Sequence, residues 1–224
     1  MILNSPSNPT GGILEEKDLK AIGEIVLNSN IIVISDEIYE YYLYKNFKHI
    51  SIASLSEDLK KRTFVVNGTS KSYSMTGLRI GYTAGDAEVI KKIGILQDHS
   101  TSNPTSISQK MAVTALGLPK SYRGDVRKIF ENRSQRMVEL LSQAKGFKPF
   151  IPQGAFYVFC DIEGTGLGSE ALCEQLLEEI YTAVIPGKSF GSDSHARFSF
   201  ATSEKDIEEG LKRIIEWAKK RDPK

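Results

Sequence analysis

The first half of the chain alternates between short apolar runs and segments with helical spacing. The runs "IIVIS" (31–35) and "TFVVN" (63–67) are continuous and β-branched, which is typical of strands covered on both faces of a parallel sheet. A third predicted strand is "LRIGYTAG" (78–85), and "MILN" (1–4) resembles the end of a buried strand. Apolar residues three or four positions apart predict helices at 13–30 and 86–97, and a short helix before residue 63. This order of elements predicts an α/β layered fold.

From residue 106 the pattern becomes mainly helical and then returns to mixed helix and strand. Residues 106–118 and 120–146 form two long helical patterns separated by Pro119. The elements predicted after them are strands at 155–162, 182–187 and 196–202, and a helix at 169–181. A last helix opens at Ser203, with Asp206 three residues later, close to a capping box. Its predicted buried stripe is Ile207, Leu211, Ile214, Ile215 and Ala218. We therefore expect two lobes, with the boundary inside the long helices.

Composition and charge narrow the classes of partner. The chain has 224 residues, and its 29 basic and 28 acidic side chains are spread without blocks, so no charged surface for nucleic acid or an anionic membrane is expected. The two cysteines, Cys160 and Cys173, are too few for a disulfide framework, and the three histidines form no ligand pair. No apolar run is long enough to cross a bilayer, and no signal peptide is evident. We expect a cytoplasmic protein that binds no metal, nucleic acid or membrane.

Three polar clusters next to the predicted strands contain candidate functional residues. They are "SNPTG" (7–11), "SDEIY" (35–39) and "NGTSK" (67–71). In open α/β sheets, ligands bind outside the carboxyl ends of the strands. We therefore expect Asn8, Asp36, Tyr39 and Lys71 to converge on one crevice. These groups suit a bound cofactor better than a hydrolase.

The same groups meet the needs of pyridoxal 5′-phosphate, a cofactor that acts as an electron sink. Lys71 is the candidate for the imine with the cofactor. Asp36 follows an apolar strand, so it would pair strongly with the pyridine nitrogen in a low dielectric. Arg79 would supply a fixed cationic fork for the phosphate, together with the small residues at 68–70.

Simpler interpretations exist for each residue taken alone. An isolated lysine after a strand is usually a solvated surface residue, Asp36 suits a helix cap and Asn8 suits a turn. Tyr39 could serve only in packing, and Arg197 could be a polar residue that alternates along an edge strand. The ordered set of motifs favours the functional interpretation, and no single residue does so.

Five motifs occur in a fixed order: "SPSNPTG", "SDEIY", "NGTSKSYSMTGLRIGY", "PQGAFYVF" and "ARFSFATS". In this order and spacing the chain resembles the pyridoxal-phosphate enzymes of the class I/II aminotransferase family, fold type I. The resemblance implies that Lys71 is the catalytic residue, which forms the Schiff base and moves the substrate proton. It also implies that Asp36 pairs with the pyridine nitrogen, while Tyr39 and Asn8 bind the phenolic oxygen of the ring.

Further site residues follow from the same resemblance. Arg79 would bind the phosphate, and Arg197 would bind the substrate carboxylate, with Asn8 also at the substrate. Many members of the family have a serine three positions before the lysine, whereas this chain has Gly68. Ser70 or a backbone N–H would then contact the phosphate instead.

The resemblance finally implies a domain plan and an activity. Residues 1–118 would be the C-terminal part of the large cofactor-binding domain, and residues 119–224 the connecting helix and a small α+β domain. Since the N-terminal portion typical of the family is not in this sequence, we expect a truncated chain. The implied activity is transamination between an amino acid and a 2-oxo acid, in a homodimer where the full-length protein exists. The alternatives are a lyase of the same fold and a catalytically inactive fragment or interaction module.

Overall fold

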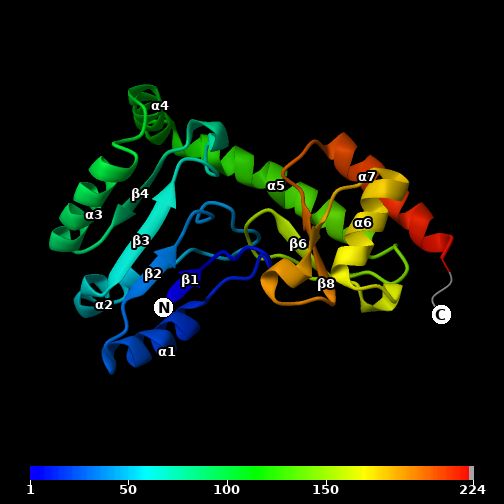
Figure 1. Ribbon diagram of the computed structural model, residues 1–224, viewed down its shortest axis with the longest axis horizontal. Helices are drawn as coiled ribbons and strands as arrows, with labels where there is room; N and C mark the ends of the chain where they lie inside the picture. The colour runs from blue at the N-terminus through cyan, green and yellow to red at the C-terminus, as the bar shows by residue number, and fades with distance from the viewer. Residues whose placement is uncertain (222–224) are drawn as a thin grey trace. The chain divides into compact units, whose positions relative to one another are not determined.

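The computed structural model describes residues 1–221 and divides the chain into two compact units (Figure 1). Unit 1 consists of Met1–Pro6 and Ile13–Asp125. Unit 2 consists of Ser7–Gly12 and the chain from Val126 onward. The turn "SNPTGG" therefore belongs to unit 2, although the strand before it belongs to unit 1.

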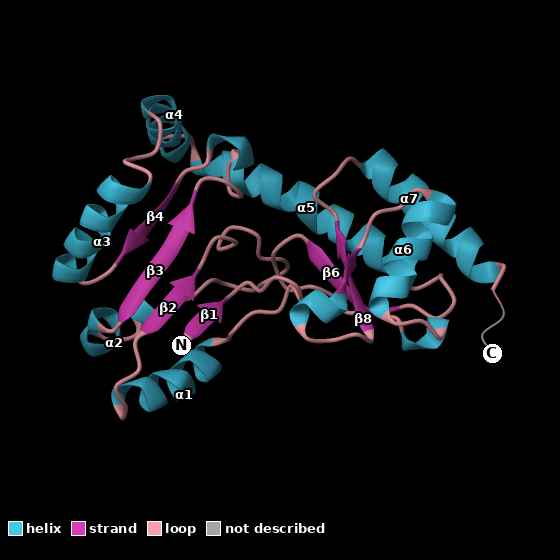
Figure 2. Ribbon diagram, viewed as in Figure 1, coloured by secondary structure: helices cyan, strands magenta, loops and turns pink. Residues whose placement is uncertain are grey.

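Unit 1 contains a four-stranded sheet in the order β1-β2-β3-β4 (Figure 2). Its strands are β1 (Ile2–Asn4), β2 (Val33–Asp36), β3 (Thr63–Gly68) and β4 (Gly81–Ala84). The first three strands are parallel, as predicted, and β4 is antiparallel to β3. The observed strand β4 is shorter than the strand predicted at 78–85, because a 3-10 turn (Thr76–Leu78) precedes it.

One face of this sheet is covered by helices α1 (Glu16–Leu27) and α2 (Glu57–Lys61). The shared core cluster consists of Leu19, Val26, Val33, Ile52 and Leu59. The prediction that both faces of the second strand are covered is wrong. Val33 is fully buried, whereas Ile34, which the strand alternation places on the opposite face, is 41% exposed.

Three helices follow the sheet along the chain. They are α3 (Ala87–Ser100), α4 (Ser106–Leu116) and α5 (Lys120–Leu141). Asp86 caps α3 by accepting hydrogen bonds from the N–H groups of Glu88 and Val89, both at 3.1 Å. The break at Pro119 lies where it was predicted, and α5 ends at Leu141, earlier than the predicted residue 146.

Unit 2 contains an antiparallel four-stranded sheet in the order β5-β6-β8-β7. Its strands are β5 (Lys148–Pro149), β6 (Tyr157–Asp161), β7 (Ile185–Pro186) and β8 (His195–Ser199). Helix α6 (Ser169–Ile180) contacts β7 and β8 of this sheet, and α7 (Glu204–Lys219) contacts α6. The two-residue strand β5 was not predicted, and β7 is much shorter than the predicted strand at 182–187.

The last helix follows its predicted pattern closely. The Ser203 side chain accepts a hydrogen bond from the Asp206 N–H at 3.1 Å, which is the expected cap. Ile207, Leu211, Ile214 and Ala218 are buried, and so is Trp217, which the stripe did not include. No helix within residues 1–221 is long and apolar enough to cross a membrane.

Candidate active site

Five of the predicted site residues lie at one end of the unit 1 sheet. Asp36 ends β2, and Tyr39 follows it. Ser70 and Lys71 follow the end of the neighbouring parallel strand β3. Because β4 is antiparallel to β3 and Gly68 pairs with Gly81, Arg79 lies at this same end of the sheet. The carboxylate, phenol, amine and guanidinium thus come from adjacent strand ends.

The segment that carries Asp36 is fixed by backbone contacts on both sides. Asp36 pairs with Asn4 of β1 and Val66 of β3. Its carbonyl oxygen accepts a hydrogen bond from Asn4 Nδ2 at 3.4 Å. Its carboxylate accepts one from the Ile38 N–H at 3.2 Å, which is an Asx turn and not the cap of an α-helix. The carboxylate stays half-buried at the strand end.

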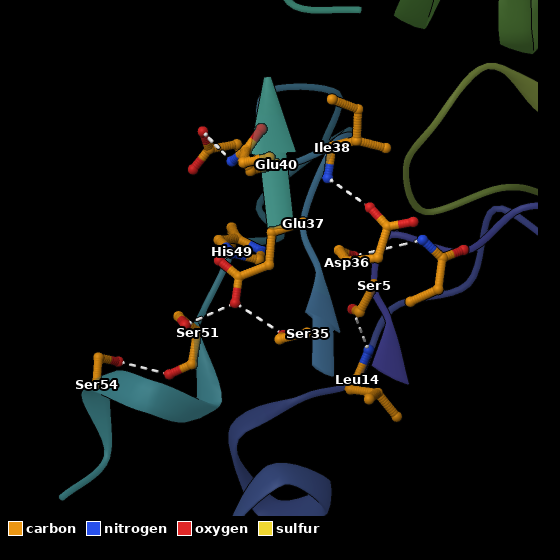
Figure 3. A network of polar contacts seen from close by, with 12 residues as sticks. Ser5, Leu14, Ser35, Asp36, Glu37, Ile38, Glu40, His49, Ser51 and Ser54 are labelled. Atoms are coloured by element: carbon orange, nitrogen blue, oxygen red, sulfur yellow. Dashed lines mark hydrogen bonds and ion pairs between the residues drawn. The ribbon is translucent and has the colours of Figure 1, made fainter. Parts of the chain in front are cut away.

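Glu37 points to the other side of the strand and lies in a polar network (Figure 3). Its carboxylate accepts hydrogen bonds from Ser35 at 2.9 Å and Ser51 at 2.6 Å, and contacts His49 Nε2 at 2.8 Å. Burial raises the pKa of Glu37, but the hydrogen bonds from His49, Ser51 and Ser35 outweigh it, so the pKa lies below its ordinary value. The buried acid is therefore charged and held by three partners.

Sequence reasoning missed this network, although a signal for it exists. Val33, Ser35 and Glu37 alternate along the strand, and all three are buried. A glutamate in register with a core-facing position needs hydrogen-bonding partners, because burying an unpartnered charge is very costly. The partners His49 and Ser51 are recognisable only in the folded chain.

Two hydrogen bonds link the segment after β2 to the segment that carries Lys71. Tyr42 donates its hydroxyl proton to the carbonyl oxygen of Lys71 at 2.7 Å. Asn67 Nδ2 donates to Glu40 at 2.9 Å. Burial raises the pKa of Tyr42 to about 12, so its phenol remains a donor. Tyr39, between these anchors, is only 4% exposed.

The turn after β3 holds Lys71 in a compact run of small residues. The N–H groups of Tyr73, Ser74 and Met75 donate to carbonyl oxygens of Thr69, Lys71 and Ser70. The hydroxyl of Ser70 donates weakly to the carbonyl oxygen of Ile80 at 3.5 Å. The structure also explains Gly68: a Cβ there would lie 3.1 Å from both the Gly81 Cα and the Ile80 carbonyl oxygen. The close approach of β3 and β4 therefore favours glycine over serine at this position.

Two buried hydroxyls on either side of Lys71 fit an anionic ligand. Thr69 Oγ1 and Ser72 Oγ are buried, and neither has a hydrogen-bond partner among residues 1–221. Such groups normally find a partner. Arg79 is exposed, adopts a left-handed φ of 51° and donates Nη1 to the Thr76 carbonyl oxygen at 2.7 Å. The donor set of this sheet end is therefore suited to a phosphate group.

The remaining two predicted residues meet in unit 2. Arg197, in β8, donates Nη1 to the side-chain oxygen of Asn8 at 2.7 Å. The "SNPTG" turn is fixed because the Gly11 carbonyl oxygen accepts hydrogen bonds from the N–H groups of Gln153 and Gly154, at 2.8 and 2.9 Å. Gly11 has a φ of 68°, and a Cβ there would lie 2.5 Å from Pro152 Cβ. The turn "SNPTG" (7–11) and the motifs "PQGAFYVF" and "ARFSFATS" therefore belong to one unit.

The alternative interpretation placed Arg197 on an edge strand, but β8 pairs with both β6 and β7. Arg197 is half-buried and paired with an asparagine 189 positions away. The convergence of Asn8 with Asp36, Tyr39 and Lys71 stays a prediction. Among residues 1–221, no group of three or more His, Cys, Asp or Glu is arranged to hold a metal ion.

These features define an α/β protein whose sheet end presents an amine, a carboxylate and a guanidinium, with a second antiparallel α+β unit. The family model described as aminotransferase class I and II matches residues 1–214. The chain belongs to this family, and the resemblance stated from its motifs is confirmed.

Individual relatives agree with this assignment. The chain is 46% identical over 224 residues to an aspartate aminotransferase of Bacillus sp. (strain YM-2), and 43% identical over 225 residues to that of Bacillus subtilis. Each alignment covers 98% of this chain and 57% of the relative. The chain therefore spans a little over half the length of these relatives.

Solved structures confirm the fold. An aspartate aminotransferase from Rhizobium meliloti matches with a TM-score of 0.92 and 37% identity, covering 97% of this chain and 57% of that one. An aromatic aminotransferase from Pyrococcus horikoshii matches with a TM-score of 0.92 and 38% identity, covering 98% and 60%. The α/β fold of a partial fold type I aminotransferase is therefore as predicted.

Proposed function

We propose that this chain supplies the cofactor-attachment and carboxylate-binding residues of a pyridoxal-phosphate-dependent aminotransferase. The observation that carries the proposal is the grouping of Asp36, Lys71 and Arg79 at one sheet end, beside the buried hydroxyls of Thr69 and Ser72. Family membership supports the same activity. When bound, the cofactor would supply an electron sink for the bond broken at the α-carbon of the substrate.

Each residue of unit 1 has a role that its position supports. The Lys71 amine would hold the cofactor covalently and would accept and return the proton of the substrate α-carbon. Asp36 would pair with the pyridine nitrogen and favour its protonated form, because a carboxylate at a half-buried strand end favours the charged pair. Tyr39 hydrogen-bonds the ring oxygen. Arg79 and Ser70 bind the phosphate, which a planar guanidinium can grip with two parallel hydrogen bonds.

The residues of unit 2 bind the substrate. Arg197 pairs with the α-carboxylate of the substrate. Asn8 orients the Arg197 guanidinium by accepting its hydrogen bond. Asn8 is also assigned to the ring oxygen and to the substrate. This assigns the substrates to the class of small amino acids and 2-oxo acids. The names of the relatives, aspartate aminotransferase and aspartate/prephenate aminotransferase, support aspartate as the amino donor.

Turnover requires more than these residues. Because the chain spans about 57% of its relatives, we infer that the rest of the relatives' length contributes the remaining contacts to cofactor and substrate. The complete enzyme is then a cytoplasmic homodimer. This share of length also supports a second candidate, in which the residues of this chain attach the cofactor without turnover.

Cofactor attachment tests the proposal directly. The purified chain is incubated with pyridoxal 5′-phosphate, reduced with borohydride and mapped by peptide mass spectrometry. We expect one phosphopyridoxyl adduct on Lys71 and none in Lys71→Ala. The matched control is Lys60→Ala, since Lys60 is also a lysine of unit 1 but lies in α2, before β3, whereas Lys71 follows β3. A folded wild-type chain with no adduct, or with its adduct elsewhere, contradicts the assignment of Lys71.

A further inference from the structure

The guanidinium of Arg197 lies over two aromatic rings of unit 2. Its Cζ is 4.5 Å from the ring centre of Tyr157 and 5.0 Å from that of Phe190. Cations within about 6 Å of a ring centre are attracted to the negative face of the ring. Tyr157 begins β6, and Phe190 ends a 3-10 turn (Gly187–Phe190). Two separate segments therefore supply rings to the same cation.

The rings are themselves held in place. Phe159 pairs directly with Arg197 across the β6–β8 ladder, and Tyr157 pairs with Ser199, so these side chains share one face of the sheet. Phe159 packs edge-on against Phe190, at 6.4 Å between ring centres and 89° between planes. Tyr157 is 7% exposed. The Tyr157 ring is therefore part of the unit 2 core, and Phe190 is held at its edge by Phe159.

The contacts of Arg197 leave its charge available to a ligand. Its Nη1 donates to the neutral amide of Asn8, and the rings are also neutral. These partners orient the guanidinium but do not neutralise its positive charge, whereas an aspartate would. Its Nε is buried and has no hydrogen-bond partner within residues 1–221. A buried guanidinium N–H of this kind calls for an acceptor, and a carboxylate matches the guanidinium fork.

We propose that Tyr157 and Phe190 are positioning residues that hold the Arg197 guanidinium in the orientation that binds a carboxylate ligand. Asn8 fixes one end of the fork, the two rings fix its plane, and the Nε edge takes the ligand. The inference rests on the proposed function, which assigns carboxylate binding to Arg197. It adds that affinity for the carboxylate depends on aromatic side chains that do not touch the ligand's charge.

The first experiment measures the orientation of Arg197 in the 224-residue chain. In a ¹⁵N-labelled sample, the Nε–H resonance of Arg197 is assigned by its loss in Arg197→Lys. We expect slow rotation of the guanidinium in the wild type and faster, averaged rotation in Phe190→Leu. Phe190→Tyr keeps a ring and should restore the wild-type signature. Phe190 is 37% exposed, so its replacement by leucine leaves the fold intact.

A matched control separates this effect from a general loss of packing. Phe150 is also an exposed aromatic residue of unit 2, and it stacks on His195 at 5.7 Å between ring centres. We expect Phe150→Leu to leave the Arg197 resonance unchanged. Tyr157→Phe should also leave it unchanged, because it keeps the ring beneath the guanidinium.

The second experiment measures ligand affinity, with succinate as the probe carboxylate. We expect Phe190→Leu to weaken succinate binding about three- to tenfold, the range given by one cation–π contact. Phe190→Tyr and Phe150→Leu should bind like the wild type. Arg197→Lys should bind much more weakly, because lysine lacks the planar fork.

The outcomes distinguish a failure of the positioning inference from a failure of the proposed function. If Phe190→Leu keeps both the wild-type Arg197 resonance and the wild-type succinate affinity, the positioning inference is overturned and the proposed function is untouched. If the wild type does not bind succinate, or Arg197→Lys binds it equally well, the carboxylate role of Arg197 fails, and the inference fails with it.

Discussion

Glu37 shows how much a single side chain can contribute beside a candidate active site. Its neighbour Asp36 faces the strand end, and Glu37 faces the core with Ser35, His49 and Ser51 around its carboxylate (Figure 3). These contacts fix the strand end that carries Asp36. The same contacts couple folding to pH, because the carboxylate is more acidic in the folded state.

The pH dependence of stability tests this role of Glu37. Because the folded-state pKa is depressed, its stabilising contribution is present above the ordinary value of 4.5 and is lost as pH falls through the lower folded-state value. We expect Glu37→Gln to reduce the free energy of unfolding by about 1–3 kcal/mol at neutral pH, the cost of disrupting a buried charged network. The loss should shrink as pH falls below 4.5.

Denaturant titrations at several pH values measure this difference. Glu57→Gln is the control, since the Glu57 side chain is 79% exposed and forms only a surface ion pair with Lys60. A constant difference between wild type and Glu37→Gln at every pH would show that the Glu37 charge has no folding linkage.

At the scale of elements, the close approach of β3 and β4 explains why the chain departs from the common motif at Gly68. We expect Gly68→Ala to destabilise unit 1 by about 1–3 kcal/mol, because its Cβ would lie 3.1 Å from backbone atoms that cannot rotate away. Gly77→Ala is the matched control, since a Cβ there meets nothing within 4 Å. Denaturation midpoints compare the two variants. Equal midpoints would mean that β4 can move away from β3.

Local sequence patterns predict helices and strands well where one hydrophobic period dominates a segment. The helix stripe at Ile207, Leu211 and Ile214 and the cap at Ser203 are visible in sequence because both depend on residues three or four positions apart. The direction of β4 and the two-residue strands β5 and β7 are not visible, because they depend on pairing with distant strands.

The candidate site divides in the same way. The candidate residues Asp36 and Lys71 follow strand ends, so their positions after predicted strands, taken together with the ordered motifs, suffice to choose them as candidates. The contacts that orient the candidate residues cannot be identified in this way. Tyr42 hydrogen-bonds Lys71 from 29 positions away, and the ring under the Arg197 guanidinium comes from Phe190, in a turn with no periodic pattern. Supporting residues are chosen by tertiary packing, which a single sequence does not display.

At the scale of the whole molecule, the chain divides into two compact units, and each unit contains different residues of the predicted site. A domain with its own core can unfold by itself. The single tryptophan, Trp217, lies buried in unit 2 and reports on that unit alone. Hydrogen exchange of β2 and β3 amides reports on unit 1.

Leu211→Ala tests whether the units unfold separately. Leu211 is 3% exposed in α7, so its truncation should cost about 2–5 kcal/mol in unit 2. We expect the Trp217 fluorescence transition to move to lower denaturant while the protection of the β2 and β3 amides stays at wild-type values. Lys212→Ala, on the exposed side of the same helix, should change neither signal. If Leu211→Ala lowers both signals together, the two cores form one cooperative unit, and the residues for cofactor and carboxylate binding are stabilised jointly.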